Sequence, residues 1–316
     1  DDTESMSKAF GIMDNQSALI SEWDLPTLKD LLQELDTGEL DMAITGFTSE
    51  ELENLMTQVH QGLTPDDEIP EKVETICQVG DLWQLGKHRL LCGDATRRED
   101  VDRLMDGEKA DMVFTDPPYG INLKPVKNYA SKKEHKRREE YQPITGDDGS
   151  FDFELVYPLI QSNVWYVWGA DYLFGKIPDF EIGNLIVWAK RFTEDESDKV
   201  FGSAFELCWH KPKQKKVIWF ERAINQSAEA MGIHPTQKPT ALAMRAIEES
   251  SKPNAKIIDL FGGSGSTLIA CEKLGRRCFM MEIENFYTSI IIKRWMAYTG
   301  KEAFREDGRS WTELEQ

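Results

Sequence analysis

The feature that most constrains this 316-residue chain is an alternation of short apolar runs and amphipathic stretches that begins after Thr96. Apolar runs of roughly four to eight residues predict strands, and apolar residues at helical spacing predict helices. We expect strands at residues 110–115, 164–169, 185–190, 204–210, 215–220, 255–261 and 277–284, and helices at 98–105, 153–161, 171–177, 239–250, 266–275 and 286–298.

Strands that alternate with helices are typical of an α/β fold in which helices cover both faces of a mostly parallel sheet. The consecutive strand patterns at 204–210 and 215–220 predict one antiparallel pair at a sheet edge. Two further apolar runs, 81–85 and 88–92, flank Gly86 and Lys87 and predict a hairpin. The sequence therefore favours a doubly wound sheet with a hairpin before it.

Charge divides the chain into two parts. Residues 1–75 hold 19 acids and 3 bases, a net charge of −16, whereas residues 76–316 hold 37 acids and 34 bases. The apolar residues between Ser17 and Met56 have helical spacing, and the polar stretch at 61–72 resembles a linker. We predict an acidic helical segment over 1–75 and a catalytic domain over 76–316. Because the acidity is concentrated in the first segment, it does not exclude DNA as a partner of the second.

Cysteine content and hydropathy exclude several classes of protein. The five cysteines form no CxxC pair, so they fit neither a disulfide framework nor a zinc site and predict reduced core residues. No apolar run reaches the roughly 18 residues that a membrane span requires, and the acidic N-terminus does not resemble a signal peptide. We expect a cytosolic protein with no bound metal and no membrane partner.

A glycine-rich turn, "DLFGGSGSTLIA", joins a predicted strand to a predicted helix at Asp259–Ala270. Glycines let the backbone approach a ligand closely, and the helix N-terminus offers free amides to an anionic group. Glu282 ends the next strand, where an acid can bind both hydroxyls of a ribose. A nicotinamide enzyme would use the same arrangement, but its string would read GxGxxG and would come earlier in the sheet. The turn predicts a nucleoside-containing cofactor.

The tetrapeptide "DPPY" at Asp116–Tyr119 ends another buried strand. Two prolines cannot continue a sheet ladder, and a carboxylate at that point costs free energy unless it binds something. The tetrapeptide is either a structural turn or a rigid platform for chemistry.

Taken in order, "GDA", "DPPYG", "HPTQKP", "DLFGGSGST" and the strand-end Glu282 resemble the beta class of S-adenosylmethionine-dependent DNA amino-methyltransferases over residues 80 to about 299. The resemblance implies a circularly permuted Rossmann-like fold whose sheet has seven strands, six parallel and one antiparallel. Residues 15–56 resemble the tail of ParB-like domains that precede such enzymes. The ParB-like core is missing here, so nuclease or partition activity does not follow.

The resemblance assigns residues to cofactor and target. Phe261, Gly263 and Gly265 would form the cofactor turn, Thr267 would lie near the methionine carboxylate, and Glu282 would bind the ribose. The cofactor-binding residues implied are Asp94, Ala95, Asp116, Lys238, Asp259, Phe261, Gly262, Gly263, Ser264, Gly265, Thr267 and Glu282.

For catalysis, Asp116, Pro117, Pro118 and Tyr119 would activate an exocyclic amine. The Asp116 carboxylate and the Pro117 carbonyl can accept its two hydrogens, and Tyr119 offers a ring for a base turned out of the duplex. In the family, Asp at the first position favours adenine N6 and Ser favours cytosine N4. Cytosine C5 transfer would need a cysteine, usually after proline, and the chain has no Pro-Cys dipeptide. Protein glutamine methyltransferases have the opposite motif order. Cytosine-N4 methylation, RNA adenine methylation and a non-catalytic DNA-binding protein stay open.

Basic residues beside the tetrapeptide predict contacts with DNA phosphates. The DNA-binding residues expected are Lys124, Lys127, Lys132, Lys133, Lys136, Arg137, Arg138 and Arg222. Family members usually place a target-recognition region before "HPTQKP", but here that interval is only Glu221–Ile233. We therefore expect a short or degenerate target sequence. A homodimer or a partner subunit stays open.

Overall fold

The computed structural model describes residues 42–47, 62–70, 73–121, 145–190, 203–214, 217–221 and 237–315. The chain divides into two compact units, Asp1–Gln61 and Gly62–Gln316. In the first unit only the 3₁₀ helix η1 (Met42–Thr45) and the two residues after it are described, so most of the predicted helical segment lies outside the described residues. The boundary predicted after residue 75 stays a prediction, but residues 62–75 belong to the second compact unit.

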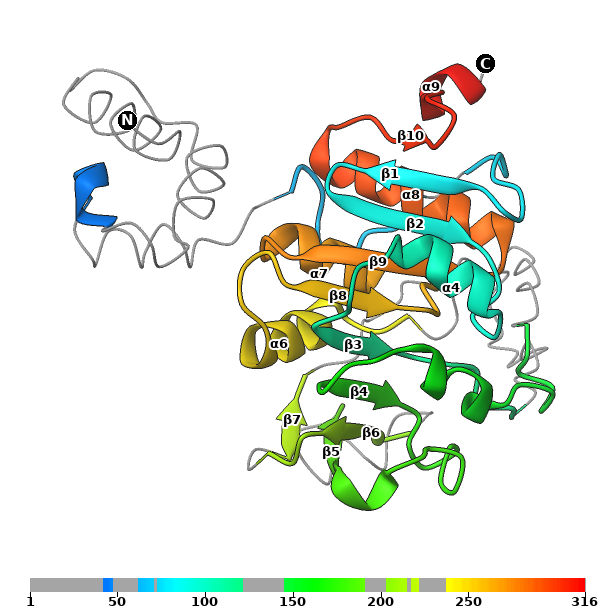
Figure 1. The fold of residues 1–316 in the computed structure, drawn as a ribbon, viewed down its shortest axis with the longest axis vertical. Helices are drawn as coiled ribbons and strands as arrows, with labels where there is room; N and C mark the ends of the chain where they lie inside the picture. Colours follow the sequence, from blue (N-terminus) through cyan, green and yellow to red (C-terminus); the bar gives the residue numbers. More distant parts are fainter. Residues whose placement is uncertain are drawn as a thin grey trace, which may run out of the picture. The chain divides into compact units, whose positions relative to one another are not determined.

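The second unit contains one ten-stranded sheet in the order β10-β1-β2-β9-β8-β3-β4-β6-β5-β7 (Figure 1). Its strands are β1 (Leu82–Leu85), β2 (His88–Cys92), β3 (Met112–Thr115), β4 (Trp165–Trp168), β5 (Asn184–Ala189), β6 (Phe205–Lys211), β7 (Ile218–Phe220), β8 (Lys256–Asp259), β9 (Arg277–Glu282) and β10 (Phe304–Arg305). Its helices are α4 (Arg98–Met105), α6 (Thr240–Ser250), α7 (Ser266–Lys273), α8 (Asn285–Thr299) and α9 (Trp311–Leu314), with 3₁₀ helices η2 (Phe153–Leu155), η3 (Tyr157–Leu159) and η4 (Phe180–Ile182).

Parallel pairing dominates the centre of the sheet. β2, β9, β8, β3 and β4 run parallel to one another, and β6 lies antiparallel to both β4 and β5. The mixed α/β class is therefore confirmed, as is the antiparallel β1–β2 hairpin. The expected count of seven strands is not confirmed, because β1, β10 and β7 extend the sheet to ten.

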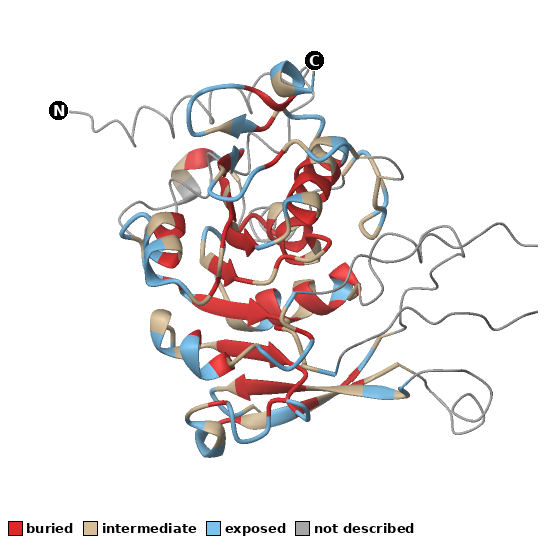
Figure 2. Cartoon of the chain, turned by 90° about the vertical axis from the view of Figure 1, so that its right-hand side faces the viewer, coloured by how far each residue is buried: buried red, intermediate tan, exposed pale blue. Residues whose placement is uncertain are grey.

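The central strands of the sheet are buried in the core. Every residue of β3 and β4 is buried, as expected for strands covered on both faces. Val113, Ile258 and Phe279 form a core cluster with the apolar face of α4. α7 packs against both α6 and α8, and each of these three helices contacts the sheet. Figure 2 shows this buried core along the central strands.

Two predicted helices are absent. Residues 153–161 form the short 3₁₀ turns η2 and η3, because the Asp152 side chain caps Glu154 and Pro158 has no N–H to continue a helix. Residues 171–177 form turns. The strands predicted at 204–210 and 215–220 do not pair with each other, because β5 lies between β6 and β7. β5 forms a ladder of six residue pairs with β6, whereas β7 has only three residues.

The stretch that resembles a linker packs against the second unit. The Asp67 Oδ1 atom accepts hydrogen bonds from the Thr240 backbone N–H and hydroxyl, both at 2.8 Å, and so caps α6. Asp66 forms an ion pair of 2.5 Å with Lys273, and its carbonyl accepts a hydrogen bond of 2.6 Å from Arg294. Residues 62–70 are therefore a structural part of this unit.

All five cysteines are buried and none forms a disulfide, as predicted. Among the described helices, none combines the length and the apolar content that crossing a bilayer requires.

Candidate active site

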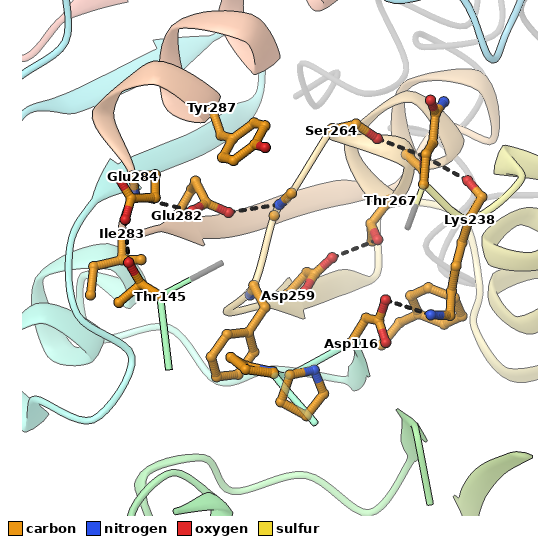
Figure 3. Close-up of a pocket in the computed structure, with 18 of the residues that line it drawn as sticks. Asp116, Thr145, Lys238, Asp259, Ser264, Thr267, Glu282, Ile283, Glu284 and Tyr287 are labelled. Carbon is orange, nitrogen blue, oxygen red and sulfur yellow. Dashed lines mark hydrogen bonds and ion pairs between the residues drawn. The ribbon is translucent and has the colours of Figure 1, made fainter. Parts of the chain in front are cut away.

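A pocket lies at the carboxyl ends of β3, β8 and β9, where the predicted cofactor turn and the DPPY tetrapeptide meet (Figure 3). Such a position is the usual ligand site of an open α/β sheet. The predicted site residues that line it are Asp116, Pro117, Pro118, Tyr119, Lys238, Asp259, Phe261, Gly262, Gly263, Ser264, Thr267 and Glu282. Residues that the sequence did not single out also line it, among them Thr145, Glu284 and Tyr287.

The glycine-rich turn crosses the sheet closely between β8 and α7. A Cβ atom on Gly262 would come within 2.9 Å of the Met280 side chain. Gly265, the N-cap of α7, has φ +84°, which a residue with a side chain adopts only at a cost. These two glycines are therefore required by the backbone path of the turn.

Glu282 is held by backbone donors. Its Oε2 atom accepts a hydrogen bond from the Gly263 N–H at 2.7 Å, and its Oε1 atom accepts one from the Glu284 N–H at 3.0 Å. Burial raises the pKa of Glu282 to about 7. Each carboxylate oxygen keeps a free lone pair for a hydroxyl donor. The side chain thus has the orientation and the acceptor capacity to bind a diol.

Asp259, the last residue of β8, stabilises the turn through hydrogen bonds. Its carboxylate accepts hydrogen bonds from the Thr267 hydroxyl at 2.6 Å, the Thr115 hydroxyl at 3.2 Å and the Phe261 N–H at 3.1 Å. Burial raises the pKa of Asp259 to about 7. The Thr267 hydroxyl, which was expected near a methionine carboxylate, is thus bonded to Asp259.

Arg294 supports the same turn from α8. The side chain is 2% exposed, and its Nη1 atom donates to the Ser264 carbonyl at 2.6 Å. Its Nη2 atom donates to the Asp66 carbonyl, also at 2.6 Å. One buried guanidinium therefore connects the glycine-rich turn to the segment 62–70.

The DPPY tetrapeptide forms the opposite wall, and its acid is paired. The Lys238 Nζ atom lies 2.5 Å from Asp116 Oδ2 and 3.0 Å from the Tyr119 hydroxyl. The Tyr119 hydroxyl in turn donates to Asp116 Oδ1 at 2.6 Å. Burial and the neighbouring Asp116 raise the pKa of Tyr119, so the phenol stays protonated.

A second carboxylate reaches Lys238 from β6. Glu206 Oε2 lies 3.3 Å from Lys238 Nζ, and its other oxygen forms an ion pair with Lys190. Burial opposes the charge on Lys238, but Asp116 and Glu206 outweigh that effect and raise its pKa. Glu206 was not predicted as a site residue, although a single acid between the apolar Phe205 and Leu207 of a strand is a usable signal.

Three predicted cofactor residues do not line the pocket. The Asp94 carboxylate accepts hydrogen bonds from the Thr96 N–H and hydroxyl, at 2.9 and 2.7 Å. Ala95 belongs to the core, and Gly265 serves as the helix cap. The predicted DNA-binding residues Lys124, Lys127, Lys132, Lys133, Lys136, Arg137, Arg138 and Arg222 lie outside the described residues.

Known proteins resemble the chain over both of its parts. Residues 208–293 match the model of a family described as DNA methylase, and residues 26–79 match that of the ParB-methyltransferase HTH domain. Type II methyltransferase M2.LlaDCHI of Lactococcus lactis subsp. cremoris is 25% identical over 221 residues, 59% of this chain and 82% of that protein. Type II methyltransferase M2.DpnII of Streptococcus pneumoniae is 26% identical over 224 residues, 60% of this chain and 84% of that protein.

Solved structures of DNA methyltransferases are also similar. The complex of M1.HpyAVI with SAM has a TM-score of 0.43 and 22% identity, and the match covers 65% of this chain and 98% of that one. The cytosine-N4-specific PvuII methyltransferase has a TM-score of 0.43 and 15% identity, over 65% of this chain and 85% of that one.

The resemblance that the motifs predicted is therefore confirmed by the sequence comparisons. The chain thus contains a match to a DNA methylase domain, and a match to a ParB-methyltransferase HTH domain precedes it.

Proposed function

We propose that this chain transfers a methyl group from S-adenosylmethionine to the exocyclic N6 amine of adenine in DNA. The observation that carries the proposal is the position of Asp116 and Tyr119 on one wall of a pocket whose other wall is the glycine-rich turn with Glu282. A donor of methyl groups and an acceptor amine would thus meet across one cavity.

The cofactor side of the pocket fits a charged nucleoside. Glu282 offers two carboxylate oxygens for the ribose hydroxyls, and Gly262 and Gly263 line the pocket beside it. When bound, S-adenosylmethionine supplies a methyl group on a positively charged sulfur.

The target side activates a poor nucleophile. The lone pair of an exocyclic amine is delocalised into the base, so the protein must localise it on nitrogen. The Asp116 carboxylate accepts one amine hydrogen and the Pro117 carbonyl accepts the other, which directs the lone pair toward the methyl group. Pro117 and Pro118 fix this backbone, and the Tyr119 ring supports a base that has left the stack. Direct transfer requires no covalent intermediate, and no cysteine lines the pocket among the described residues.

The order of motifs supports a circular permutation. β3, which carries DPPY, precedes β8, which carries the glycine-rich turn, yet the two strands are neighbours in the sheet. The central run β2-β9-β8-β3-β4-β6-β5 contains six strands in one direction and β6 in the other. We infer that these seven form the methyltransferase sheet and that β1, β10 and β7 are additions to it.

The interval between β7 and Lys238 is too short for many base contacts, and each good bidentate contact gives about 1–3 kcal/mol of discrimination. We therefore propose a short or degenerate target for the catalytic domain, with the HTH domain or a partner subunit as further sources of sequence reading.

One experiment tests the function directly. The full chain is incubated with isotope-labelled S-adenosylmethionine and random-sequence duplex DNA, and in a parallel reaction with random-sequence RNA. The nucleosides of both reactions are separated by mass. The proposal predicts labelled N6-methyldeoxyadenosine. Labelled N4-methyldeoxycytidine would favour the second candidate, a cytosine-N4 enzyme of the same family, and label on RNA alone would contradict DNA as the substrate.

A further inference from the structure

Lys238 occupies the position that a target amine would need. Its ammonium group lies 2.5 Å from Asp116 Oδ2 and 3.0 Å from the Tyr119 hydroxyl, and 5.6 Å from the centre of the Tyr119 ring. An adenine amine that donates to Asp116 Oδ2 would require the same acceptor atom. The lysine nitrogen therefore acts as an internal substitute for the amine nitrogen.

Tyr172 occupies the position that the base ring would need. Its ring is stacked on Tyr119 with 5.0 Å between the ring centres and 10° between the planes. A base cannot enter between two rings at this separation, because each of two stacking contacts needs about 3.5 Å. The face of Tyr119 that stacks on Tyr172 is therefore closed to a base.

We propose that the target slot is filled by the chain's own Lys238 and Tyr172 when no base is bound, and that an entering adenine displaces both side chains. The inference rests on the proposed function, since it assigns the slot to a base with an exocyclic amine. Tyr172 and Glu206 thus act as positioning residues beside the tetrapeptide Asp116–Tyr119.

Glu206 provides the alternative partner for Lys238. Its Oε2 atom already lies 3.3 Å from the ammonium group, and Lys190 holds its other oxygen in place. When the target amine binds Asp116, the Lys238 ammonium can move fully onto Glu206 without losing a charged partner. The exchange keeps the buried positive charge paired throughout, which avoids the large cost of an unpaired buried ion.

The backbone around Tyr172 allows it to leave. The turn lies between Gly169, at φ +73°, and Gly175, at φ +81°. The Tyr172 side chain is 46% exposed, whereas Trp168, which precedes the turn, is fully buried. A Cβ atom on Gly169 would lie 2.0 Å from the Tyr119 ring, so this glycine sets the close approach of the turn to Tyr119.

Two variants and two matched controls test the proposal in the full chain. Tyr172→Ala should open the Tyr119 face and lower the dissociation constant for a fluorescein-labelled single-stranded adenine oligonucleotide, measured by anisotropy, about fivefold. Phe174→Ala should leave it unchanged, because Phe174 is on the same turn but contacts Phe180 instead. Higher affinity from both variants would also overturn the assignment to Tyr172.

Glu206→Gln should trap Lys238 on Asp116 and raise the same dissociation constant about tenfold, with the affinity for S-adenosylmethionine within about twofold of wild type. Glu249→Gln is its control, because Glu249 forms a part-exposed ion pair of 3.1 Å with Arg245 on α6, away from Lys238. If Glu206→Asp restores the wild-type dissociation constant for the oligonucleotide, the carboxylate acts by pairing with Lys238 and not by supporting the fold.

Failure of this inference can be separated from failure of the proposed function. If wild type methylates DNA but neither Tyr172→Ala nor Glu206→Gln changes oligonucleotide affinity, the slot is not self-occupied. Tighter binding by Glu206→Gln or weaker binding by Tyr172→Ala would also overturn the proposal. If wild type transfers no label to any nucleic acid, the proposed function fails, whereas the affinity changes still report on the slot.

Discussion

The two walls of the pocket are built differently. The cofactor wall comes from one contiguous stretch of chain, 259–287, and its acid Glu282 is held by the N–H groups of Gly263 and Glu284. The target wall joins four separate segments, which carry Asp116–Tyr119, Tyr172, Glu206 and Lys238. Its acid Asp116 is held by the side chains of Lys238 and Tyr119. Backbone donors are fixed by the fold, whereas side-chain partners can exchange. We infer that the cofactor wall is preorganised and that the target wall rearranges.

The largest expected effect is on the target wall. Asp116→Ala should lower the single-turnover rate of methyl transfer by about 100- to 1000-fold, because it removes the acceptor for the amine hydrogen. Quenched-flow assays with labelled cofactor measure this rate. Asp116→Asn keeps an acceptor oxygen but not the charge and should be intermediate. A wild-type rate in Asp116→Ala would refute the role of the tetrapeptide.

The next effect concerns the charge on Glu282. Hydroxyl donors prefer the ionised carboxylate, so a pKa of about 7 means that the cofactor affinity of wild type should rise as the pH increases through 7. Below that value we expect a loss of up to about tenfold per pH unit. Calorimetry between pH 6 and pH 8 measures this slope. Glu282→Gln should bind weakly and show a flatter profile, and an equally steep slope in that variant would exclude Glu282 as its source.

As the pH rises, the free energy of unfolding of the cofactor-free protein should fall, whereas the cofactor affinity should increase. Glu282 and Asp259 both have folded-state pKa values of about 7, above the usual carboxyl range. Their contribution to the free energy of unfolding is complete below about pH 4 and is lost as the pH rises to about 7. Urea unfolding of Asp259→Asn alongside wild type should show a smaller loss of stability in the variant over that pH range. Parallel pH curves would contradict the assignment to Asp259.

A smaller effect is expected behind the cofactor wall. Asp67→Ala removes the cap of α6 and should lower the free energy of unfolding by about 1 kcal/mol, which urea denaturation measures. Glu68→Ala is the control, because Glu68 is the exposed neighbour. Equal stabilities of the two variants would show that the segment 62–70 does not support the domain.

The smallest effect is expected from the first unit. A protein that begins at Gly62 keeps Asp66 and Asp67, so its affinity for S-adenosylmethionine should stay within about twofold of the full chain. A protein that begins at Ile76 loses both aspartates and should bind more weakly. Calorimetry on both proteins tests this, and equal affinities would show that the segment 62–70 is dispensable for the cofactor wall.

The structure brings together those predicted site residues that are close to one another in the chain. The turn at Gly262 and Gly263 and the strand-end Glu282 belong to one strand, turn, helix and strand unit, so their proximity follows from local geometry. Asp94 was expected in the same pocket, but its carboxylate closes its own turn with Thr96, a short-range bond that motif order does not reveal.

The target wall could be predicted only in part, because it depends on strand order. Glu206 reaches Lys238 because β6 lies beside β4, at the part of the sheet where the predicted pairing of 204–210 with 215–220 was wrong. Tyr172 reaches Tyr119 through a turn that was predicted to be helical. Both contacts are long-range in sequence, and neither the apolar periodicity nor the motifs encode them.

The difference between the walls is tested most directly by one titration. S-adenosylmethionine is titrated calorimetrically into Asp116→Ala and Glu282→Ala under identical conditions. We predict that Asp116→Ala binds within about threefold of wild type, although its rate of methyl transfer is about 100- to 1000-fold lower. Glu282→Ala should bind at least about tenfold more weakly because it loses two charge-assisted hydrogen bonds. Equal losses of affinity in the two variants would contradict the division of the pocket into a preorganised cofactor wall and a separate target wall.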